Sequence, residues 1–451
     1  MAKAIATGQK ATPASASKRG VAGHPPEGAT STQAKAQQPW WRSLGPGLIT
    51  GAADDDPSGI ATYSQGGAQF GYDVAWTILL TYPLMVAIQL ASARIGRVTG
   101  RGLADTFARF CPTWSVYGLV SLLVLANVIN LGADLSAMGA SAALIGGGHA
   151  TSFAVAFGIV SLLLQVFLPY ARYVSVLKWL TLSLLAYVGV AFSVHIDWLA
   201  ALHATVIPTI RWNRDYVTTI VAILGTTISP YLFFWQAEQE VEEIKRVPVD
   251  KPLRIAPRQR KSQLRRLHID TFVGMGFSNA IAFFMILATA ATLHAHGVTD
   301  IETPAQAAEA LQPIAGQFAF VLFALGIVGT GMLALPVLAG SAAYAVSSLL
   351  GVRKGLDRPL ATAKPFYGVL AAAMAVGVAI SLSGLNPIKA LYWAAVINAV
   401  ISVPIMVAVM LAASRPKIMG DLVLPRRWQI LGWLATAAMA LATIAMLVTM
   451  I

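Results

Sequence analysis

About eleven long apolar segments, separated by short polar connections, constrain this chain more than any other feature of its sequence. Each segment reaches the roughly 20 residues that a helix needs to cross the hydrocarbon core of a bilayer. Lipid offers no partner to backbone N–H and C=O groups, so such spans are helical. The sequence therefore predicts an all-α integral membrane protein with about 11 transmembrane helices. The spans are expected near residues 45–69, 73–97, 114–143, 151–170, 174–195, 216–240, 270–294, 316–349, 366–384, 389–412 and 428–450.

Composition agrees with this class of protein. Hydrophobic residues make up 56% of the 451 residues and charged residues only 12%, about half the charge density of a typical soluble domain. Residues 1–42 differ, because they are rich in Ala, Ser, Thr, Lys and Pro and cannot bury enough apolar surface to offset the entropy of ordering. We expect a disordered cytoplasmic tail at 1–42 and a transmembrane domain at 43–451. The single cysteine, Cys111, excludes an internal disulfide and a cysteine metal cluster.

The Lys and Arg residues, which give the chain a net charge of +12, fall on alternate connections between the spans. All but three of the 32 lie in the tail or near the ends of the even-numbered spans, the exceptions being Arg211, Arg214 and Lys389. Cytoplasmic loops carry such an excess of positive charge. We therefore expect an integral protein of a bacterial inner (plasma) membrane, with its N-terminus in the cytoplasm and its C-terminus outside. The basic loop 245–266 is expected to contact anionic membrane lipid, and no nucleic-acid partner is expected.

The first span contains the sequence Gly51-Ala-Ala-Asp-Asp-Asp-Pro-Ser-Gly59. An ionised aspartate near the centre of a bilayer costs at least about 3 kcal/mol, so three in succession indicate a functional site. Pro57 removes a helical hydrogen bond, and the backbone is expected to unwind there. Irregular backbone at this depth is tolerated where it lines a cavity or is buried in protein. The sequence therefore predicts that the first span is a broken helix.

The sixth span contains Gly225-Thr-Thr-Ile-Ser-Pro-Tyr231, in which Pro230 follows small hydroxyl residues within an apolar stretch. Taken alone, an ordinary proline kink explains this pattern equally well. Spans 1 and 6 are, however, the first helices of two successive groups of five, which have opposite orientations. Interrupted helices at matching positions of inverted repeats point to a binding site near the middle of the membrane in a secondary transporter. The repeats are expected at about 43–195 and 214–413, with an extra helix at 428–450.

Six short motifs carry a resemblance to a known family. In their order and spacing they resemble the Nramp family of divalent metal ion transporters, over nearly all of the chain after the tail. The resemblance implies a leucine-transporter-type inverted repeat (5+5) with broken helices 1 and 6. It also implies proton-linked import of a metal cation, which is a substrate and not a bound cofactor. The motifs are Gly45-Pro-Gly47, Asp56-Pro57, Gly67 to Tyr72, Val98-Thr-Gly-Arg101, Gly225 to Pro230 and Ser414-Arg-Pro-Lys-Ile-Met-Gly420.

Several positions depart from the family pattern. The family's Asp-Pro-Gly-Asn motif reads Asp56-Pro57-Ser58-Gly59, so the aspartate is kept and the asparagine has become a glycine. The family's Ala-x-x-Met motif reads Thr226-x-x-Ser229, and its histidine after the following proline is Tyr231. The soft thioether is thus replaced by hydroxyl oxygen, and an all-oxygen set of ligands suits Mg²⁺, Mn²⁺ or Ca²⁺.

The resemblance also assigns the remaining candidate ligands. Gln89 stands at the family's span-two glutamine position and Ser402 at its span-ten glutamine position. Losing both the asparagine and the methionine leaves room for a hydrated ion, which Mg²⁺ prefers to remain. We therefore expect Mg²⁺ or Mn²⁺ to be favoured over Fe²⁺. The candidate metal-site residues are Asp56, Asp55, Asp54, Gly59, Thr226, Ser229, Gln89 and Ser402, with the helix breaks at Pro57 and Pro230.

Proton coupling rests on fewer residues. In the third span the family's Asp-x-x-Glu pair reads Asp134-x-x-Ala137, so the resemblance makes Asp134 the candidate for the proton path. The alternative for Asp134 is a hydrogen-bonded contact between helices. Asp54 and Asp55 are candidates for carrying protons, for ligating the ion or for capping the following half-helix. Proton symport and uncoupled flux both stay open.

Two other functions also stay open, in addition to a metal sensor or a channel without alternating access, which the sequence does not separate from a transporter. One is an organic-solute or amino-acid/cation symporter on the same fold, which three site carboxylates disfavour for any anionic substrate group. The other is an intramembrane metal-dependent enzyme, which would need a second acidic metal motif. We therefore predict a transporter that is not an enzyme, of undetermined oligomeric state. Near the end of the sixth span, pairing with nearby Lys and Arg is favoured over an acidic vestibule for Glu238, Glu240, Glu242 and Glu243.

Overall fold

The computed structural model of the protein describes residues 46–168 and 180–450, and all regular structure within these ranges is helical. The expected tail at 1–42 lies outside the described residues, as does the connection 169–179. Residues Ser43–Ile451 form one unit by their internal contacts. The all-α prediction is confirmed for the part of the chain that the structure describes.

The first half of the chain contains the first broken helix and three long helices. Residues 55 and 56 interrupt the first expected span, between α1 and α2. The elements are α1 (Pro46–Asp54), α2 (Pro57–Phe70), η2 (Gly71–Val74), α3 (Trp76–Thr99), α4 (Leu103–Phe107), α5 (Thr113–Gly146), α6 (Ala150–Phe167), η3 (Leu180–Leu184), α8 (Leu185–Ser193) and α9 (Trp198–Val206).

The second half repeats this plan and begins with the second broken helix. Residues 228 and 229 interrupt the sixth expected span, between α10 and α11. The elements are α10 (Arg214–Thr227), α11 (Pro230–Arg246), η4 (Pro257–Gln259), α12 (Arg260–Thr292), η5 (His294–His296), α13 (Pro304–Glu309), α14 (Gln312–Ala315), η6 (Gly316–Phe318), α15 (Ala319–Leu349), η7 (Leu360–Thr362), α16 (Lys364–Ser381), α17 (Pro387–Ser414), α18 (Pro416–Met419), η8 (Gly420–Leu422) and α19 (Arg426–Met450).

Nine helical segments in the described ranges are long and apolar enough to cross a membrane, and a tenth is possible if the bent pair Leu182–Ser193 and Trp198–Val206 is one span. This number of membrane-spanning helices is lower than the predicted number of about eleven for two reasons. The α1–α2 segment is broken and carries three carboxylates. The segment that ends in α8 begins next to residues 169–179, which the structure does not describe.

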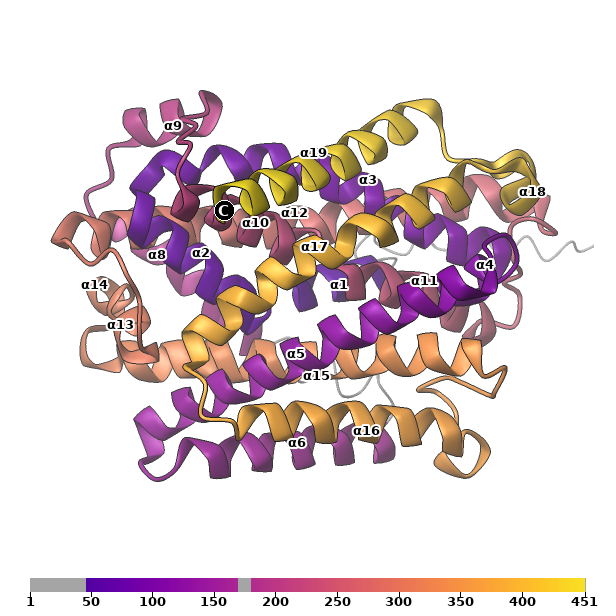
Figure 1. Ribbon diagram of the computed structural model, residues 1–451, viewed down its shortest axis with the longest axis horizontal. Coiled ribbons are helices and arrows are strands. Elements are labelled where there is room, and N and C mark those ends of the chain that lie inside the picture. Colours follow the sequence, from indigo (N-terminus) through magenta and orange to yellow (C-terminus); the bar gives the residue numbers. More distant parts are fainter. Residues whose placement is uncertain (1–45, 169–179, 451) are drawn as a thin grey trace, which may run out of the picture. The chain divides into compact units, whose positions relative to one another are not determined.

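The broken helices lie in the interior of the bundle. One side of the bundle is a group of four helices that pack together, α5, α6, α15 and α16 (Figure 1). The other side contains α3, α12, α17 and α19, and most pairs of these helices are in contact. Helix α1 contacts α12 and α15, and α11 contacts α3 and α15. The most apolar stretch of the α10–α11 segment is wholly buried. The fold therefore encloses both breaks in protein and keeps them away from lipid, as irregular backbone in a membrane requires.

Two glycines let the broken first helix approach α12 closely. A Cβ atom on Gly51 of α1 would lie 2.2 Å from the carbonyl oxygen of Gly274, so backbone meets backbone there. A Cβ atom on Gly67 of α2 would lie 2.1 Å from the hydroxyl oxygen of Thr289 and 2.5 Å from the carbonyl oxygen of Ile286. The hydrophobic effect does not drive helices together inside a membrane. Small residues at such positions allow the close packing that stabilises helix pairs there. Both halves of the broken helix are thus docked on one continuous helix.

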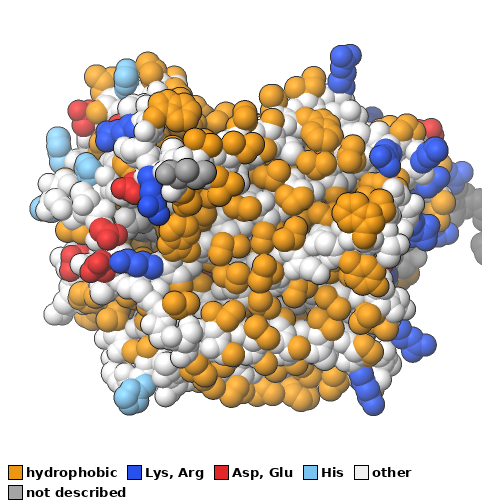
Figure 2. Space-filling view, in the orientation of Figure 1, with side chains coloured by type: hydrophobic (Ala, Val, Ile, Leu, Met, Phe, Trp, Pro, Cys, Tyr) orange, Lys and Arg blue, Asp and Glu red, His pale blue; other side chains and the backbone are white. Residues whose placement is uncertain are grey.

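The outer surface has the pattern of a membrane protein. Figure 2 shows apolar side chains over the middle of the face, Lys and Arg gathered at one end, and most of the acidic and histidine side chains at the other. We call these the basic end and the acidic end. Many exposed large side chains are hydrophobic, including Leu163, Phe167, Leu441 and Val448 on α6 and α19. A belt of this kind between two polar ends suits a bilayer.

Candidate functional site

The first break is organised by Asp56. Its Oδ1 accepts hydrogen bonds from the hydroxyl of Ser58 at 2.7 Å and the backbone N–H of Gly59 at 2.8 Å, and it caps the N-terminus of α2. Pro57 takes the first position of α2, where the missing N–H donor costs nothing. A negative charge at a helix N-terminus is also stabilised by the helix dipole. The sequence Asp-Pro therefore both breaks the span and holds one carboxylate at the break.

The second break is held by hydroxyl groups and has no acidic side chain of its own. The Ser229 hydroxyl lies 2.8 Å from the carbonyl oxygens of Gly225 and Thr226. The Ser402 hydroxyl on α17 donates to the carbonyl oxygen of Ile228 at 2.8 Å. These bonds satisfy carbonyl groups that the interruption releases. Of the residues predicted from the sequence, Ser229 and Ser402 therefore lie at the second break.

The structure brings the two breaks together. The Tyr231 hydroxyl of α11 donates to Oδ2 of Asp56 at 2.9 Å, and the Tyr63 hydroxyl of α2 lies 3.2 Å from Oγ1 of Thr227. A Cβ atom on Gly59 would lie 3.2 Å from Oγ1 of Thr226. That oxygen is buried and has no hydrogen-bond partner among the described residues. The position where the family pattern places an asparagine is thus bordered by the Thr226 hydroxyl, the Tyr63 ring and the carbonyl oxygen of Asp54.

Asp54 and Asp55 face a different helix. The Ser278 hydroxyl of α12 lies 2.6 Å from Oδ2 of Asp54 and 3.0 Å from Oδ1 of Asp55, although one hydroxyl carries one hydrogen. The second oxygen of each carboxylate is buried without a hydrogen-bond partner in the described ranges. No group of three or more His, Cys, Asp and Glu side chains in these ranges could hold a metal ion together. The three aspartates therefore do not form one cluster of ligands.

Two further predicted residues are buried without hydrogen bonds. Both carboxylate oxygens of Asp134 on α5 lack a partner within the described ranges, and Asp134 interacts electrostatically with Asp56. Both amide atoms of Gln89 on α3 likewise lack a partner there, and no hydrogen bond joins Gln89 to the other candidate ligands. Buried polar groups are nearly always paired in folded proteins. Asp134 and Gln89 are therefore exceptions to this rule among the described residues.

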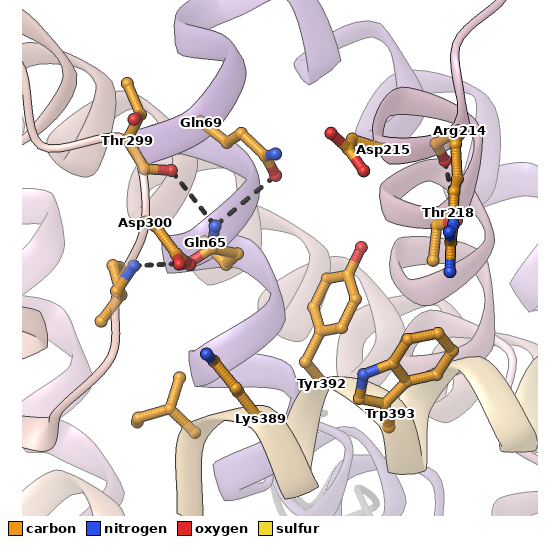
Figure 3. Close-up of a pocket in the computed structure, with 12 residues that line it drawn as sticks. Gln65, Gln69, Arg214, Asp215, Thr218, Thr299, Asp300, Lys389, Tyr392 and Trp393 are labelled. Atoms are coloured by element: carbon orange, nitrogen blue, oxygen red, sulfur yellow. Dashed lines mark hydrogen bonds between the residues drawn. The ribbon is translucent and has the colours of Figure 1, made fainter. Parts of the chain in front are cut away.

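The aspartates at the first break are closed off from solvent, since each of Asp54, Asp55 and Asp56 is at most 2% exposed. A cavity of about 430 Å³ opens at the acidic end instead (Figure 3). There the Gln65 side chain of α2 bonds to the carbonyl oxygen of Thr299 and the N–H of Ile301. The cavity is lined by Gln65, Gln69, Arg214, Asp215, Thr218, Thr299, Asp300, Ile301, Ile388, Lys389, Tyr392 and Trp393.

At the basic end, the glutamates of α11 are paired with cations, as predicted. Glu238 lies 2.7 Å from the Lys354 amine, and Glu240 lies 2.8 Å from the Arg266 guanidinium. Glu242 and Glu243 pair with Lys245 and Arg246 of the next turn. Burial lowers the pKa of Lys354, but the neighbouring carboxylates of Glu238 and Asp105 raise it by more. The pKa therefore lies above the usual value for lysine, and the amine stays charged. All four glutamates at the basic end of α11 are therefore in ion pairs.

Two residues of the site were not among the predicted ligands. Tyr231 was noted only as a departure from the family pattern, and its bond to Asp56 could not be foreseen without the fold. Ser278 gave no signal, because a single serine in an apolar span is common.

The chain is similar to known membrane transporters. Among curated relatives, the divalent metal cation transporter MntH of Acidiphilium cryptum is 27% identical over 402 residues, covering 85% of each chain. That of Deinococcus radiodurans is 26% identical over 401 residues, covering 86% of each. A crystal structure of the Eremococcus coleocola manganese transporter superposes with a TM-score of 0.68 at 16% identity, covering 94% of this chain and 88% of that one.

The inward-facing structure of Mhp1 superposes with a TM-score of 0.52 at 13% identity, covering 89% of this chain and 90% of that one. The predicted leucine-transporter-type fold, with broken first and sixth spans, is confirmed by these likenesses and by the two breaks. The exact bounds of the two repeats stay a prediction. The profile of the family described as natural resistance-associated macrophage protein-like matches residues 47–449. A match over nearly the whole chain shows that this protein belongs to the Nramp family.

Proposed function

We propose that this protein is a secondary transporter that moves a divalent metal cation across the membrane by alternating access, with Mg²⁺ or Mn²⁺ favoured over Fe²⁺. The observation that carries the proposal is the meeting of the two broken helices at Asp56. This carboxylate is fully buried, and the described groups that hydrogen-bond to it are two hydroxyls and one backbone N–H, none of them cationic. A buried carboxylate without a basic partner favours a bound cation. The family of the chain is one of transporters and not of enzymes.

The chemistry of the donors supports a hard cation. Among the predicted ligands, the side chains of Asp56, Thr226 and Ser229 at the breaks all offer oxygen, and the carbonyl oxygen of Asp54 lies next to Gly59. One sulfur atom is close to the first break, because a Cβ atom on Gly331 would lie 2.4 Å from Sδ of Met138 and 3.2 Å from Cγ of Pro57. The position of Gly59 is tightly surrounded, because even a Cβ atom there would lie 3.2 Å from Oγ1 of Thr226. Mg²⁺ dehydrates reluctantly and is usually bound by one or two carboxylates while keeping several waters. A site with one central carboxylate suits that preference.

The relatives support transport of a divalent cation in general. Curated relatives are named as divalent metal cation transporters, and a structural neighbour is named as a manganese transporter. In the alternating-access cycle that we propose, the cavity at the acidic end receives the ion and the paired end of α11 opens to release it. Asp134, a buried carboxylate on α5 without a hydrogen-bond partner among the described residues, is the residue that we propose for any proton movement. We place the acidic end outside a bacterial plasma membrane.

A cation-coupled symporter of organic solutes is the second candidate. One observation favours it, because a structure of Mhp1, described as a nucleobase-cation-symport-1 family transporter, superposes with a TM-score of 0.50. The three carboxylates at the first break argue against it for any substrate with an anionic group, because like charges in a buried site repel.

Uptake into proteoliposomes tests the proposal. Wild type, Asp56→Ala and the control Asp197→Asn are compared with Mg²⁺, Mn²⁺, Fe²⁺ and Ca²⁺ outside and a pH-sensitive dye inside. Asp197 is exposed and caps α9, and asparagine caps a helix equally well. We expect saturable Mg²⁺ or Mn²⁺ uptake that Asp56→Ala abolishes and Asp197→Asn preserves, and the dye decides proton coupling. Uptake that is absent for every ion, or indifferent to Asp56→Ala, would overturn the proposal.

A further inference from the structure

A second cavity lies at the basic end and is lined by an unusual set of side chains. Its volume is about 520 Å³, and it opens between the connections that follow α3, α11 and α17. Five lining residues are Lys or Arg and none is acidic. These five, which we call the cation cluster, are Arg101, Arg109, Arg254, Arg415 and Lys417.

The charges of the cation cluster are not neutralised within the described ranges. No ion pair found there involves any of the five, whereas other cations nearby are paired. The Asp105 carboxylate is engaged by Lys354, and that of Asp250 by Arg97. Burial lowers the pKa of Arg101, and the guanidinium groups of Arg109 and Arg254 lower it further against the opposing effect of Asp105. Positive charges are therefore held close together without counter-charges of their own.

Backbone contacts hold this arrangement in place together with the ion pair of Arg97 and Asp250. The N–H groups of Leu253 and Arg254 donate to the carbonyl oxygens of Arg97 and Val98, at 3.1 and 3.2 Å. Gly100 has a φ of +67°, and a Cβ atom there would lie 2.6 Å from Cγ of Pro252. The loop after α11 is thus fixed against the end of α3, and a glycine is needed at the contact.

Two side chains of the cation cluster, Arg254 and Arg415, are oriented by uncharged neighbours that do not neutralise them. The Arg254 guanidinium donates to the carbonyl oxygen of Ile418 at 3.3 Å, and the Arg415 guanidinium lies 5.0 Å from the centre of the Phe110 ring. Stacking on an aromatic ring holds a guanidinium without neutralising it. Two family motifs, at 98–101 and 414–420, supply Arg101, Arg415 and Lys417 and take no part in the breaks. The metal site therefore does not account for them.

We propose that this cavity is an anion-binding site that takes a phosphate group, either on an anionic lipid headgroup or as a free phosphate compound. Guanidinium groups present a planar fork of donors that matches phosphate oxygens, and such charge-assisted bonds are among the strongest in proteins. The site lies at the end of the bundle where Lys and Arg gather, the position at which anionic lipids meet a membrane protein (Figure 2). The inference does not rest on the proposed transport function.

The test uses the purified full-length protein in a neutral detergent. Its melting temperature is measured against inorganic phosphate, with chloride at matched ionic strength as the reference. It is measured separately against short-chain phosphatidylglycerol, with phosphatidylcholine as the reference. The variants are Arg101→Gln with Arg254→Gln, and the control is Arg353→Gln, a basic-end residue outside the cavity lining. We expect a saturable stabilisation that the control keeps and the double variant shifts to about tenfold higher concentration or loses.

The two arms identify the source of the phosphate. Stabilisation by phosphatidylglycerol alone assigns the site to a lipid headgroup, and stabilisation by both ligands shows that the phosphate group suffices. If the double variant does not fold, Arg109→Gln with Lys417→Gln replaces it, since both side chains are exposed. The proposal is wrong if neither ligand stabilises the protein beyond its reference, or if the cluster variants respond as the control does.

Discussion

The two breaks lie side by side but are built from different groups. The break between α1 and α2 contributes three carboxylates, and the break between α10 and α11 contributes hydroxyls, carbonyls and a tyrosine. Both are stabilised by a proline at the first position of the following helix. The difference indicates that one repeat supplies the charge that attracts a cation and the other supplies neutral oxygens. Variants of one break at a time should therefore show which break determines the affinity for the ion and which determines the selectivity among ions.

The largest effect is expected from removing the charge of the first break. Asp56→Asn keeps a side-chain oxygen that can cap α2, so the fold should persist. It removes the carboxylate at the centre of the site, and we expect metal uptake by proteoliposomes to fall at least about a hundredfold. Circular dichroism and size-exclusion chromatography would check the fold. Uptake near the wild-type rate would show that the charge acts elsewhere, for example through Asp134.

A smaller effect is expected from adding sulfur to the second break. Ser229→Met restores the thioether of the family pattern, and soft ligands favour softer metals. We expect the ratio of Cd²⁺ or Fe²⁺ uptake to Mg²⁺ uptake to rise about tenfold. Ser229→Ala is the matched control, because it removes the same hydroxyl without adding sulfur. An equal change in both variants would mean that the lost hydroxyl, and not the sulfur, sets the preference.

The serine that faces Asp54 and Asp55 should matter for stability. Ser278→Ala removes the one hydroxyl that both carboxylates approach, and an unsatisfied buried acceptor costs about 1–3 kcal/mol. We expect a lower melting temperature in detergent. Ser136→Ala serves as a control, since that hydroxyl bonds only to the carbonyl oxygen of Gly132 in its own helix among the described residues. Unchanged melting in Ser278→Ala would show that the two carboxylates do not depend on this donor.

The hydrogen bond that joins the breaks is expected to affect the affinity for the ion. Tyr231→Phe removes the donor to Asp56 but keeps the ring, and a bond to a charged group contributes about 1.5–3 kcal/mol. We expect about a tenfold change in the apparent affinity for the transported ion, measured by uptake against ion concentration. Tyr63→Phe removes the other hydroxyl contact between the breaks and should change affinity less. Equal effects of the two variants would contradict the special place of Asp56.

The sequence predicted the local features of the site better than its long-range contacts. The break at Asp56-Pro57 follows from a run of charges and a proline within one span, which local chemistry decides. Pairing of the α11 glutamates with nearby Lys and Arg was also expected, and it holds for Glu242 with Lys245 and for Glu243 with Arg246. The contact of Asp54 and Asp55 with Ser278 joins residues more than two hundred positions apart, so periodicity and composition carry no trace of it.

The docking of both half-helices on α12 has a mechanical consequence. Gly51 places α1, and Gly67 places α2, in direct contact with this one unbroken helix, which acts as a splint across the gap. Helix α1 cannot tilt gradually relative to α12, because any independent tilt must first break the contact between the backbones of the two helices. Packed interfaces of this kind switch between discrete positions. We therefore expect the first broken helix to move either together with α12 or by an abrupt release from it.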